Sequence, residues 1–173
     1  MSVSYYKKLI EEKLGRYRSR LPIIKSMLSN GISIDNEGHY RAGPFKIPDS
    51  SLAKALNIDR RIVRETAFYI LNDEELKKLF MNLTPICSMT KVSGLLGFTS
   101  LVITVKDPKK SGIVSNVTNL IAKYGLGIRQ IFADDPELFE EPKLTVVIEG
   151  SIPGEFLSEL SKFEDVKTIT ILK

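Results

Sequence analysis

The feature that most constrains the fold is a regular alternation of strand and helix patterns in residues 98–173. The strand-like runs are rich in β-branched residues, whereas two other segments repeat apolar residues at helical spacing. The strand segments are SLVITVKD, IRQIFADD, KLTVVIEG and VKTITILK, and the helical segments are SGIVSNVTNLIAKYGLG and PGEFLSELSKF. The order is βαββαβ, which predicts a ferredoxin-like domain with two helices on one face of an antiparallel sheet and the other face open to a partner.

Residues 1–97 follow a different, mainly helical pattern. We expect helices over about 3–18 and 22–29, followed by a short β-hairpin over 32–47 around the turn DNEG. This hairpin could serve as a wing on DNA. Charge divides in the same way: 1–97 carry 16 Lys and Arg against 10 Asp and Glu, whereas 98–173 carry 9 against 11. The chain is therefore predicted to be α+β, with a mostly helical, basic domain over 1–97 and a ferredoxin-like domain over 98–173.

A helix-turn-helix motif is predicted around LAKALNIDRRIVRET. Asp49 or Ser50 can cap a first helix, and Asp59 can cap a second helix that continues to about Leu71. Glycine is common in the turn of such motifs, and this chain has Asn57 there. Asparagine adopts the left-handed conformation more readily than other residues with a side chain, so the turn remains possible.

Three arginines lie on the first turn and a half of the second helix, at Arg60, Arg61 and Arg64. A recognition helix presents side chains from this region to the major groove, where arginine can pair with guanine edges or with phosphates. The alternative is that these arginines form a solvated helix face or pair with Glu65 and neighbouring acids. The basic balance of the N-terminal half favours contact with DNA.

Cysteine and histidine are too scarce for several kinds of site. Cys87 is the only cysteine and His39 the only histidine, which excludes an internal disulfide and a Cys/His zinc cluster. No nucleophile-elbow motif is present, so we expect neither catalysis nor a cofactor nor a bound metal. The charged N-terminus and short apolar runs indicate no export or membrane insertion, and we expect a cytoplasmic protein.

An acidic segment, ADDPELFEEPKL, joins the second and third predicted strands. It gathers the carboxylates of Asp134, Asp135, Glu137, Glu140 and Glu141. Such a cluster could hold a hard cation such as Mg²⁺ or Ca²⁺. A solvated acidic loop is the alternative, and the absence of spaced ligands like those of an EF-hand favours it.

The segment VKDPKKSGIVSNVTNLIAKYGLGIRQI resembles the ACT domain, a small-ligand regulatory module of amino acid metabolism. An amino acid ligand needs an anion site, which N–H groups at the start of the helix near Gly112 can supply, and a cation site, for which Asp107 is the nearest candidate. The resemblance also implies a contribution from a neighbouring subunit through the second strand. The expected ligand-binding residues are Asp107, Ser111, Gly112, Ile113, Val114, Arg129 and Gln130. An ACT fold used only for dimerisation is the alternative.

As a whole, the chain resembles a family of archaeal proteins predicted to regulate amino acid metabolism through an ACT domain. NIDRRIVRET, GIRQIFADDPEL, EPKL and EGSIPG carry this resemblance. It implies a helix-turn-helix upstream of an effector-binding domain. We therefore expect a homodimer or higher homo-oligomer whose DNA binding changes when an amino acid or related metabolite binds. The alternative is a non-catalytic regulatory subunit that docks on an amino acid biosynthetic enzyme.

Overall fold

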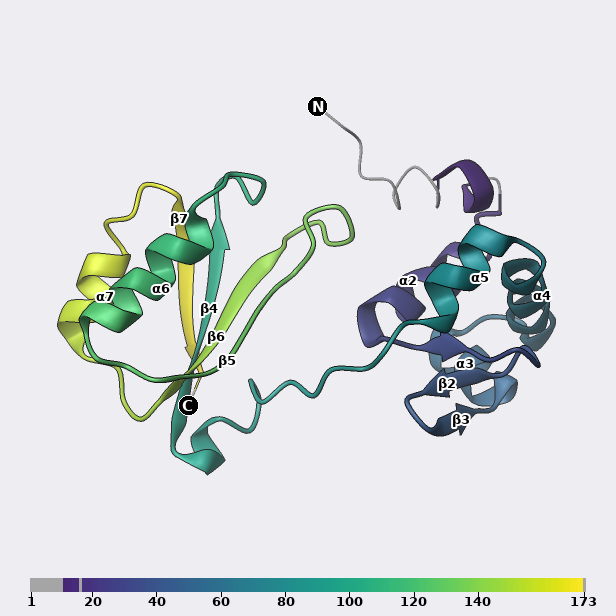
Figure 1. Ribbon diagram of the computed structural model, residues 1–173, viewed down its shortest axis with the longest axis horizontal. Coiled ribbons are helices and arrows are strands. Elements are labelled where there is room, and N and C mark those ends of the chain that lie inside the picture. The colour runs from purple at the N-terminus through teal and green to yellow at the C-terminus, as the bar shows by residue number, and fades with distance from the viewer. Residues whose placement is uncertain (1–10, 16, 173) are drawn as a thin grey trace. The chain divides into compact units, whose positions relative to one another are not determined.

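The chain forms two compact units that divide between Cys87 and Ser88 (Figure 1). The computed structural model describes residues 11–15 and 17–172. Each unit combines helices with an antiparallel sheet, so the protein is α+β. The sequence placed the boundary after residue 97, whereas the units divide earlier. Residues 88–97 group with the second unit because they hydrogen-bond to it, for example through the N–H of Met89, which donates to Gln130 at 2.9 Å.

The first unit is mainly helical. Residues 3–10 and 16 of the expected helix over 3–18 lie outside the described residues. Residues 11–14 are helical as expected, whereas residues 17 and 18 are not, so the helix ends earlier than predicted. The helix expected over 22–29 is present as α2, with a proline in its first turn and Gly31 as a left-handed cap at its end. The elements of this unit are α2 (Leu21–Asn30), β1 (Ser33–Ile34), β2 (Tyr40–Ala42), β3 (Phe45–Ile47), α3 (Asp49–Leu56), α4 (Arg60–Leu71) and α5 (Glu74–Met81).

The expected hairpin is part of a three-stranded antiparallel sheet in the order β1-β2-β3. Asp35 shapes the β1–β2 turn, since its carboxylate accepts hydrogen bonds from the N–H groups of Glu37 and His39 at 3.0 and 2.9 Å. Tyr40 of β2 is completely buried, and its hydroxyl donates to the carbonyl of Val63 in α4 at 2.8 Å. The hairpin is thereby fixed against the second helix of the predicted motif.

Asp35 is expected to stabilise the hairpin only above strongly acidic pH. Burial raises the pKa of Asp35, but hydrogen bonds from the His39 N–H, Arg41 and the Glu37 N–H outweigh burial and hold the pKa below its ordinary 3.8. Because the folded pKa is the lower one, the stabilisation is present above the unfolded pKa and lost as the pH falls through the folded pKa. We expect Asp35→Asn to lower the free energy of unfolding at neutral pH and to match wild type in strong acid, as measured by urea unfolding across pH. A constant difference at every pH would contradict this account.

Helices α3 and α4 are joined by a tight turn. Asn57 adopts the left-handed conformation there, with φ of 53°, as the sequence indicates. Asp59 caps α4, its carboxylate accepting from the Arg61 N–H at 2.7 Å. The predicted cap of α3 by Asp49 or Ser50 is wrong: Pro48 occupies the N-cap position with an extended backbone, and no side chain caps this helix. Asp49 instead lies within the first turn of α3 and is available for another partner.

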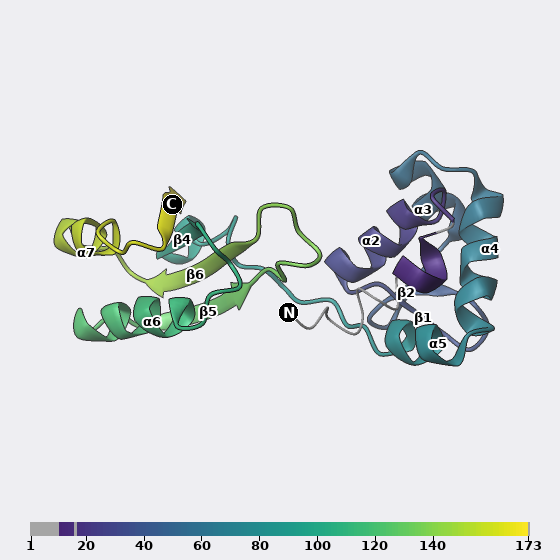
Figure 2. The same cartoon turned by 90° about the horizontal axis from the view of Figure 1, so that it is seen from above.

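The second unit has the element order β-α-β-β-α-β that the sequence predicts. Its sheet has the order β5-β6-β4-β7, with every neighbouring pair antiparallel. Both helices cover one face, and their apolar sides pack against the sheet in a single core (Figure 2). The elements are a 3₁₀ turn η1 (Gly94–Leu96), β4 (Phe98–Val105), α6 (Ile113–Lys123), β5 (Ile128–Ala133), β6 (Lys143–Glu149), α7 (Gly154–Leu160) and β7 (Val166–Leu172).

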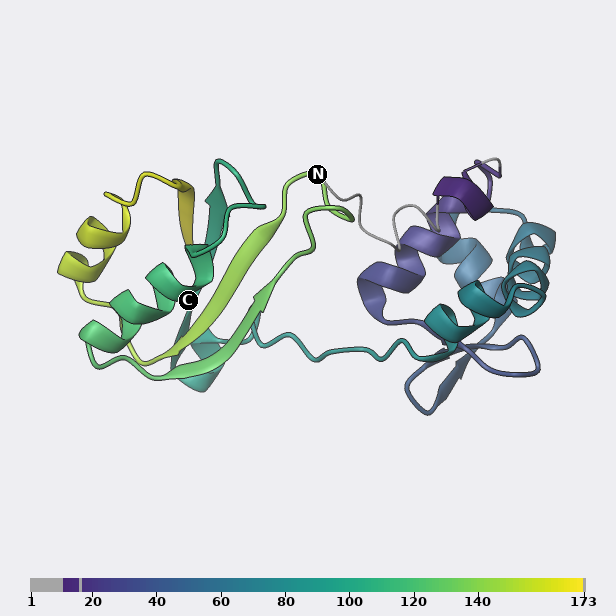
Figure 3. The same cartoon turned by 45° about the horizontal axis from the view of Figure 1, so that its top comes forward.

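The opposite face of this sheet is partly covered by the chain itself. Ser100 and Val147, paired neighbours on that face, are completely buried. The Ser100 hydroxyl donates to the carbonyl of Thr90 at 3.3 Å, and Gln130 on the same face holds the N–H of Met89. The face that was expected to be open to a partner is therefore covered in part by residues 88–97. Figure 3 shows β5 and β6 side by side up to the loop that joins them.

Candidate nucleic-acid interface and ligand pocket

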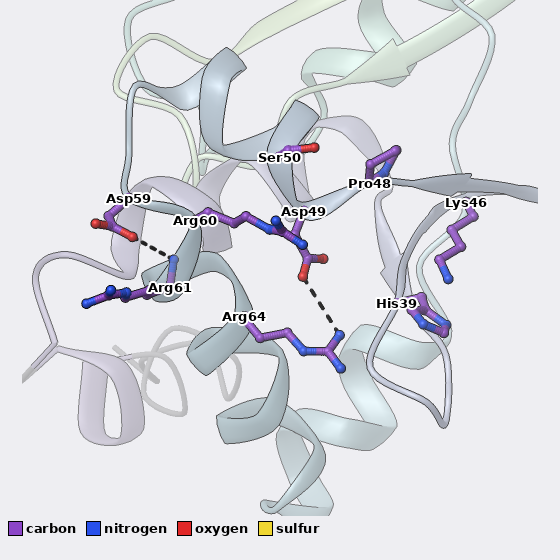
Figure 4. A pocket seen from close by; sticks show the side chains of 9 residues that line it. All are labelled: His39, Lys46, Pro48, Asp49, Ser50, Asp59, Arg60, Arg61 and Arg64. Atoms are coloured by element: carbon purple, nitrogen blue, oxygen red, sulfur yellow. Dashed lines mark hydrogen bonds and ion pairs between the residues drawn. The ribbon is translucent and has the colours of Figure 1, made fainter.

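A cavity of about 810 Å³ in the first unit contains all three arginines predicted to contact DNA. The first turns of α3 and α4 form two of its walls, and the β-hairpin forms a third (Figure 4). The lining residues are His39, Lys46, Pro48, Asp49, Ser50, Asp59, Arg60, Arg61 and Arg64. The hairpin residues His39 and Lys46 were not among the residues predicted from the sequence. The hairpin pattern was the available signal, but it did not indicate which strand would lie beside α4.

The three arginines are held differently. Arg60 and Arg64 extend toward the hairpin, whereas Arg61 extends the other way (Figure 4). Arg64 lies 3.8 Å from the carboxylate of Asp49 and 4.7 Å from the ring centroid of Phe68. Within the described part of the chain, Arg64 therefore pairs with Asp49 and not with Glu65. Arg60 and Arg61 are exposed and have no ion-pair partner among the described residues.

The cavity has an excess of positive charge. Four cations, Lys46 and the three arginines, face two carboxylates, Asp49 and Asp59, so the net charge is +2 with a neutral His39. Both carboxylates already have partners: Asp49 pairs with Arg64, and Asp59 accepts a hydrogen bond from the Arg61 N–H at the start of α4. Charged groups of one sign gathered in a concave surface attract the opposite charge. The cavity is therefore suited to an anion such as a phosphate group.

A second cavity, of about 580 Å³, lies in the second unit at the start of α6. Its walls come from the loop before α6, the first turns of α6, the end of β5 and the start of β6. Apolar side chains make up much of the lining: Val105, Pro108, Ile113, Val114, Ala133, Pro142 and Leu144. Polar groups come from Lys110, Ser111, Ser115, Thr118, Asp134 and Lys143. A mostly apolar cavity with a few convergent polar groups is typical of a small-molecule site.

Only part of the predicted ligand set lines this cavity. Ser111, Gly112, Ile113 and Val114 do, and Gly112 has φ of 94°, a conformation that residues with a side chain rarely adopt. The carboxylate of Asp107 is used inside its own loop, where it accepts from the Lys109 N–H at 3.0 Å, and Asp107 is not among the lining residues.

Arg129 and Gln130 also lie outside the lining. Arg129 pairs with Glu149 at 2.9 Å and stacks on Phe98, and Gln130 holds the N–H of Met89. The sequence could not exclude them, because both belong to β5, whose last residue, Ala133, does reach the cavity.

Asp134 is the carboxylate that lines the cavity. It follows β5 directly, and it accepts a long hydrogen bond of 3.2 Å from the Lys143 N–H. Asp134 belongs to the acidic segment and is not among the ligand-binding residues expected from the sequence. Its role in the cavity depends on the pairing of β5 with β6, which brings the two ends of the joining loop together. A carboxylate and the lysine side chain of Lys143 thus lie in one cavity with the start of α6.

Two carboxylates of the acidic loop form ion pairs with lysines. Glu137 pairs with Lys109 at 2.8 Å, and Glu141 lies 3.9 Å from Lys167. The hydrogen bond to Glu137 raises the pKa of Lys109 above its ordinary value, so this lysine stays charged. Among the described residues, no group of three or more His, Cys, Asp and Glu side chains could hold a metal ion.

Comparison with known proteins identifies no family for this chain. Neither a protein-family model nor a curated protein sequence matches it. Among solved structures, it is similar to the crystal structure of PH0061, with 16% sequence identity and a TM-score of 0.27 over 73% of this chain and 79% of that one. Within residues 11–15 and 17–172, no helix is both long enough and apolar enough to cross a membrane.

Proposed function

We propose that the protein is a ligand-responsive transcriptional regulator of amino acid metabolism. In this proposal the first unit is a helix-turn-helix domain that binds DNA, and the second is an ACT-like domain that binds an amino acid or a related metabolite. The observation that carries the proposal is the cationic cavity at the first turn of α4, which Arg60, Arg61 and Arg64 line. In the same proposal, the cavity of the second unit binds the effector, and a homo-oligomer couples effector binding to DNA binding.

The DNA-binding half is supported by local geometry and by charge. The left-handed Asn57 and the Asp59 cap define a compact two-helix element whose second helix begins at the arginines. Arg60 and Arg61 are exposed and uncompensated within the described residues, which suits them to phosphates or guanine edges. The net positive charge of the cavity supports a polyanionic partner over a protein surface of mixed charge.

The effector half is supported by the second cavity. Its volume and apolar walls suit a small molecule with an aliphatic or aromatic side chain. The N–H groups at the start of α6 suit a carboxylate, and Asp134 suits an ammonium group. An amino acid carries both charges and an apolar side chain in one molecule.

Regulation requires that the effector favours one arrangement of the oligomer. A ligand that bound every arrangement equally would leave DNA affinity unchanged. In a dimer, the spacing of two first units sets which pair of half-sites can be bound at once. We therefore expect the effector to change DNA affinity by altering that spacing, with a reciprocal effect of DNA on effector affinity.

An electrophoretic mobility-shift screen of genomic fragments tests the DNA-binding half. The expected result at low salt is a complex with a subset of fragments that survives competitor DNA. If the protein shifted all fragments equally, or shifted no fragment, the result would contradict sequence-specific binding. Co-purification with a biosynthetic enzyme in place of DNA binding would support the alternative, a non-catalytic regulatory subunit.

A thermal-shift panel of amino acids tests the effector half. A ligand at about a hundred times its dissociation constant stabilises a protein by about 2.7 kcal/mol, which moves the unfolding midpoint by a few degrees. We expect an amino acid with an apolar side chain to give this shift and Asp134→Asn to abolish it. Asp107→Asn is the matched variant, and it should keep the shift because Asp107 lies outside the cavity lining. The opposite ranking of the two variants would restore Asp107 as the ammonium site.

A further inference from the structure

Lys46 lines the same cavity as the arginines although it belongs to the β-hairpin. It lies on β3, and Figure 4 shows its side chain on the hairpin side of the cavity, toward which Arg60 and Arg64 extend. Its side chain is exposed, and within the described part of the chain it has no ion-pair partner. The nearby carboxylate of Asp49 is already engaged by Arg64. Lys46 is therefore an uncompensated cation beside α4.

The neighbouring cation of the hairpin is committed elsewhere. Arg41 lies opposite Lys46 in the pairing of β2 with β3. Its guanidinium donates to Asp35 at 3.2 Å and to the carbonyl of Pro44 at 2.7 Å, so it supports the two turns of the hairpin. Of the two basic residues in this pair, only Lys46 is available to an external anion.

The position of Lys46 relative to α4 is set by buried structure. Tyr40 pairs with Ile47, the residue after Lys46, and the buried Tyr40 hydroxyl bonds to Val63 of α4. Loss of a buried hydrogen bond of this kind costs free energy, so the hairpin is held in one place against the helix. The strand that carries Lys46 is therefore fixed next to α4, and a ligand in the cavity can contact both the first turn of α4 and the Lys46 side chain.

We propose that Lys46 binds a backbone phosphate of the same DNA that the first turn of α4 contacts. This inference rests on the proposed DNA-binding function and adds a second structural element to it. Lysine is a compact charge on a flexible chain and suits a phosphate, whereas the planar guanidinium of arginine also suits guanine edges. Phosphate contacts fix position and orientation without reading sequence. The hairpin thus contributes affinity and orientation, and Arg60 and Arg61 contribute sequence preference.

The test compares Lys46→Ala with Lys54→Ala in the full-length protein. Lys54 is an exposed lysine of α3 outside the cavity lining, so both variants lose one positive charge from the same unit. Fluorescence anisotropy would measure affinity across a salt series for two labelled duplexes, the fragment bound best in the mobility-shift screen and a mixed-sequence duplex. Thermal unfolding of both variants would verify that they fold like wild type.

Lys46→Ala is expected to weaken binding to both duplexes by the same factor and to leave their ratio unchanged. One lost phosphate contact makes the negative slope of log affinity against log salt shallower by about 0.9. Raising salt about fourfold should then lower the affinity of wild type by a factor about 3.5 times larger than for the Lys46→Ala variant. Lys54→Ala should retain the wild-type slope.

Three outcomes would overturn the inference. Equal slopes for Lys46→Ala and Lys54→Ala would exclude a phosphate contact specific to Lys46. A change in the ratio of affinities for the two duplexes would make Lys46 a base-reading residue. If wild type binds neither duplex at any salt, the proposed DNA-binding function fails together with the inference, whereas the first two outcomes leave that function standing.

Discussion

Replacing Arg60 and Arg61 together with alanine is expected to lower affinity for the preferred DNA fragment by at least about thirtyfold. An arginine that pairs with a guanine edge contributes about 1–3 kcal/mol, so two of them contribute at least about 2 kcal/mol. Both side chains are exposed at the start of α4, and neither has an ion-pair partner within the described residues, so their removal should leave the fold intact. Fluorescence anisotropy at fixed salt measures the loss, and circular dichroism verifies the fold.

The matched control is the double variant Lys25→Ala with Lys54→Ala. It removes the same two positive charges from exposed positions on α2 and α3, outside the cavity lining. This control should lose affinity only through the general decrease in charge and should keep the preference for the selected fragment. Equal losses in the two double variants would mean that the arginines act only as net charge. No loss in either would favour the solvated-face interpretation of the arginines.

Gly31→Ala is expected to destabilise the first unit by about 2–4 kcal/mol. Gly31 ends α2 with φ of 62°, where a residue with a side chain is strained by about 1–2 kcal/mol. A Cβ atom there would lie 2.2 Å from the carbonyl oxygen of Thr84 and 2.6 Å from the nitrogen of Pro85. Both are backbone atoms, so a segment of the chain must move to make room for the Cβ atom. Overpacking of this kind typically costs about 1–3 kcal/mol more.

Gly43→Ala separates the close contact from the strain. Gly43 belongs to the same unit and has a similar φ of 57°, but its nearest neighbour would be a side-chain atom of Pro85 at 3.8 Å, an ordinary contact. We expect this variant to lose only about 1 kcal/mol, because alanine also restricts the unfolded chain. Hydrogen exchange of the α2 amides resolves the difference within this unit. Equal losses would show that the approach of Thr84 to Gly31 contributes nothing.

Local sequence signals were sufficient for most of the elements. The period of apolar residues and the turn residues predicted the order βαββαβ and the two helices around Asn57. Asp59 caps α4 as predicted. A carboxylate directly before a helix can accept from the free N–H groups of its first turn, here that of Arg61, and this needs no contact with distant parts of the chain. The arginines lie where helical periodicity places them, beside one another at the start of α4.

The ligand pocket shows where local signals fail. The predicted helix start, Ser111 to Val114, lines it because those residues are contiguous in sequence. The choice between Asp107 and Asp134 could not be made from spacing, since both follow a predicted strand. The carboxylate of Asp107 accepts a hydrogen bond from the Lys109 N–H within the same loop. The pairing of β5 with β6 brings Asp134 to the cavity instead.

The sequence by itself determined the type and order of most of the elements and the positive charge of the second helix of the predicted motif, since these depend on residues within a few positions of one another. The tertiary structure alone decided which distant residues meet. It placed Lys46 in one cavity with Arg60, paired Asp49 with Arg64, and laid residues 88–97 over part of a sheet face that the sequence left open. The reason is that such meetings depend on which apolar surfaces pack together, and the packing of a whole unit is not encoded in any short segment of it.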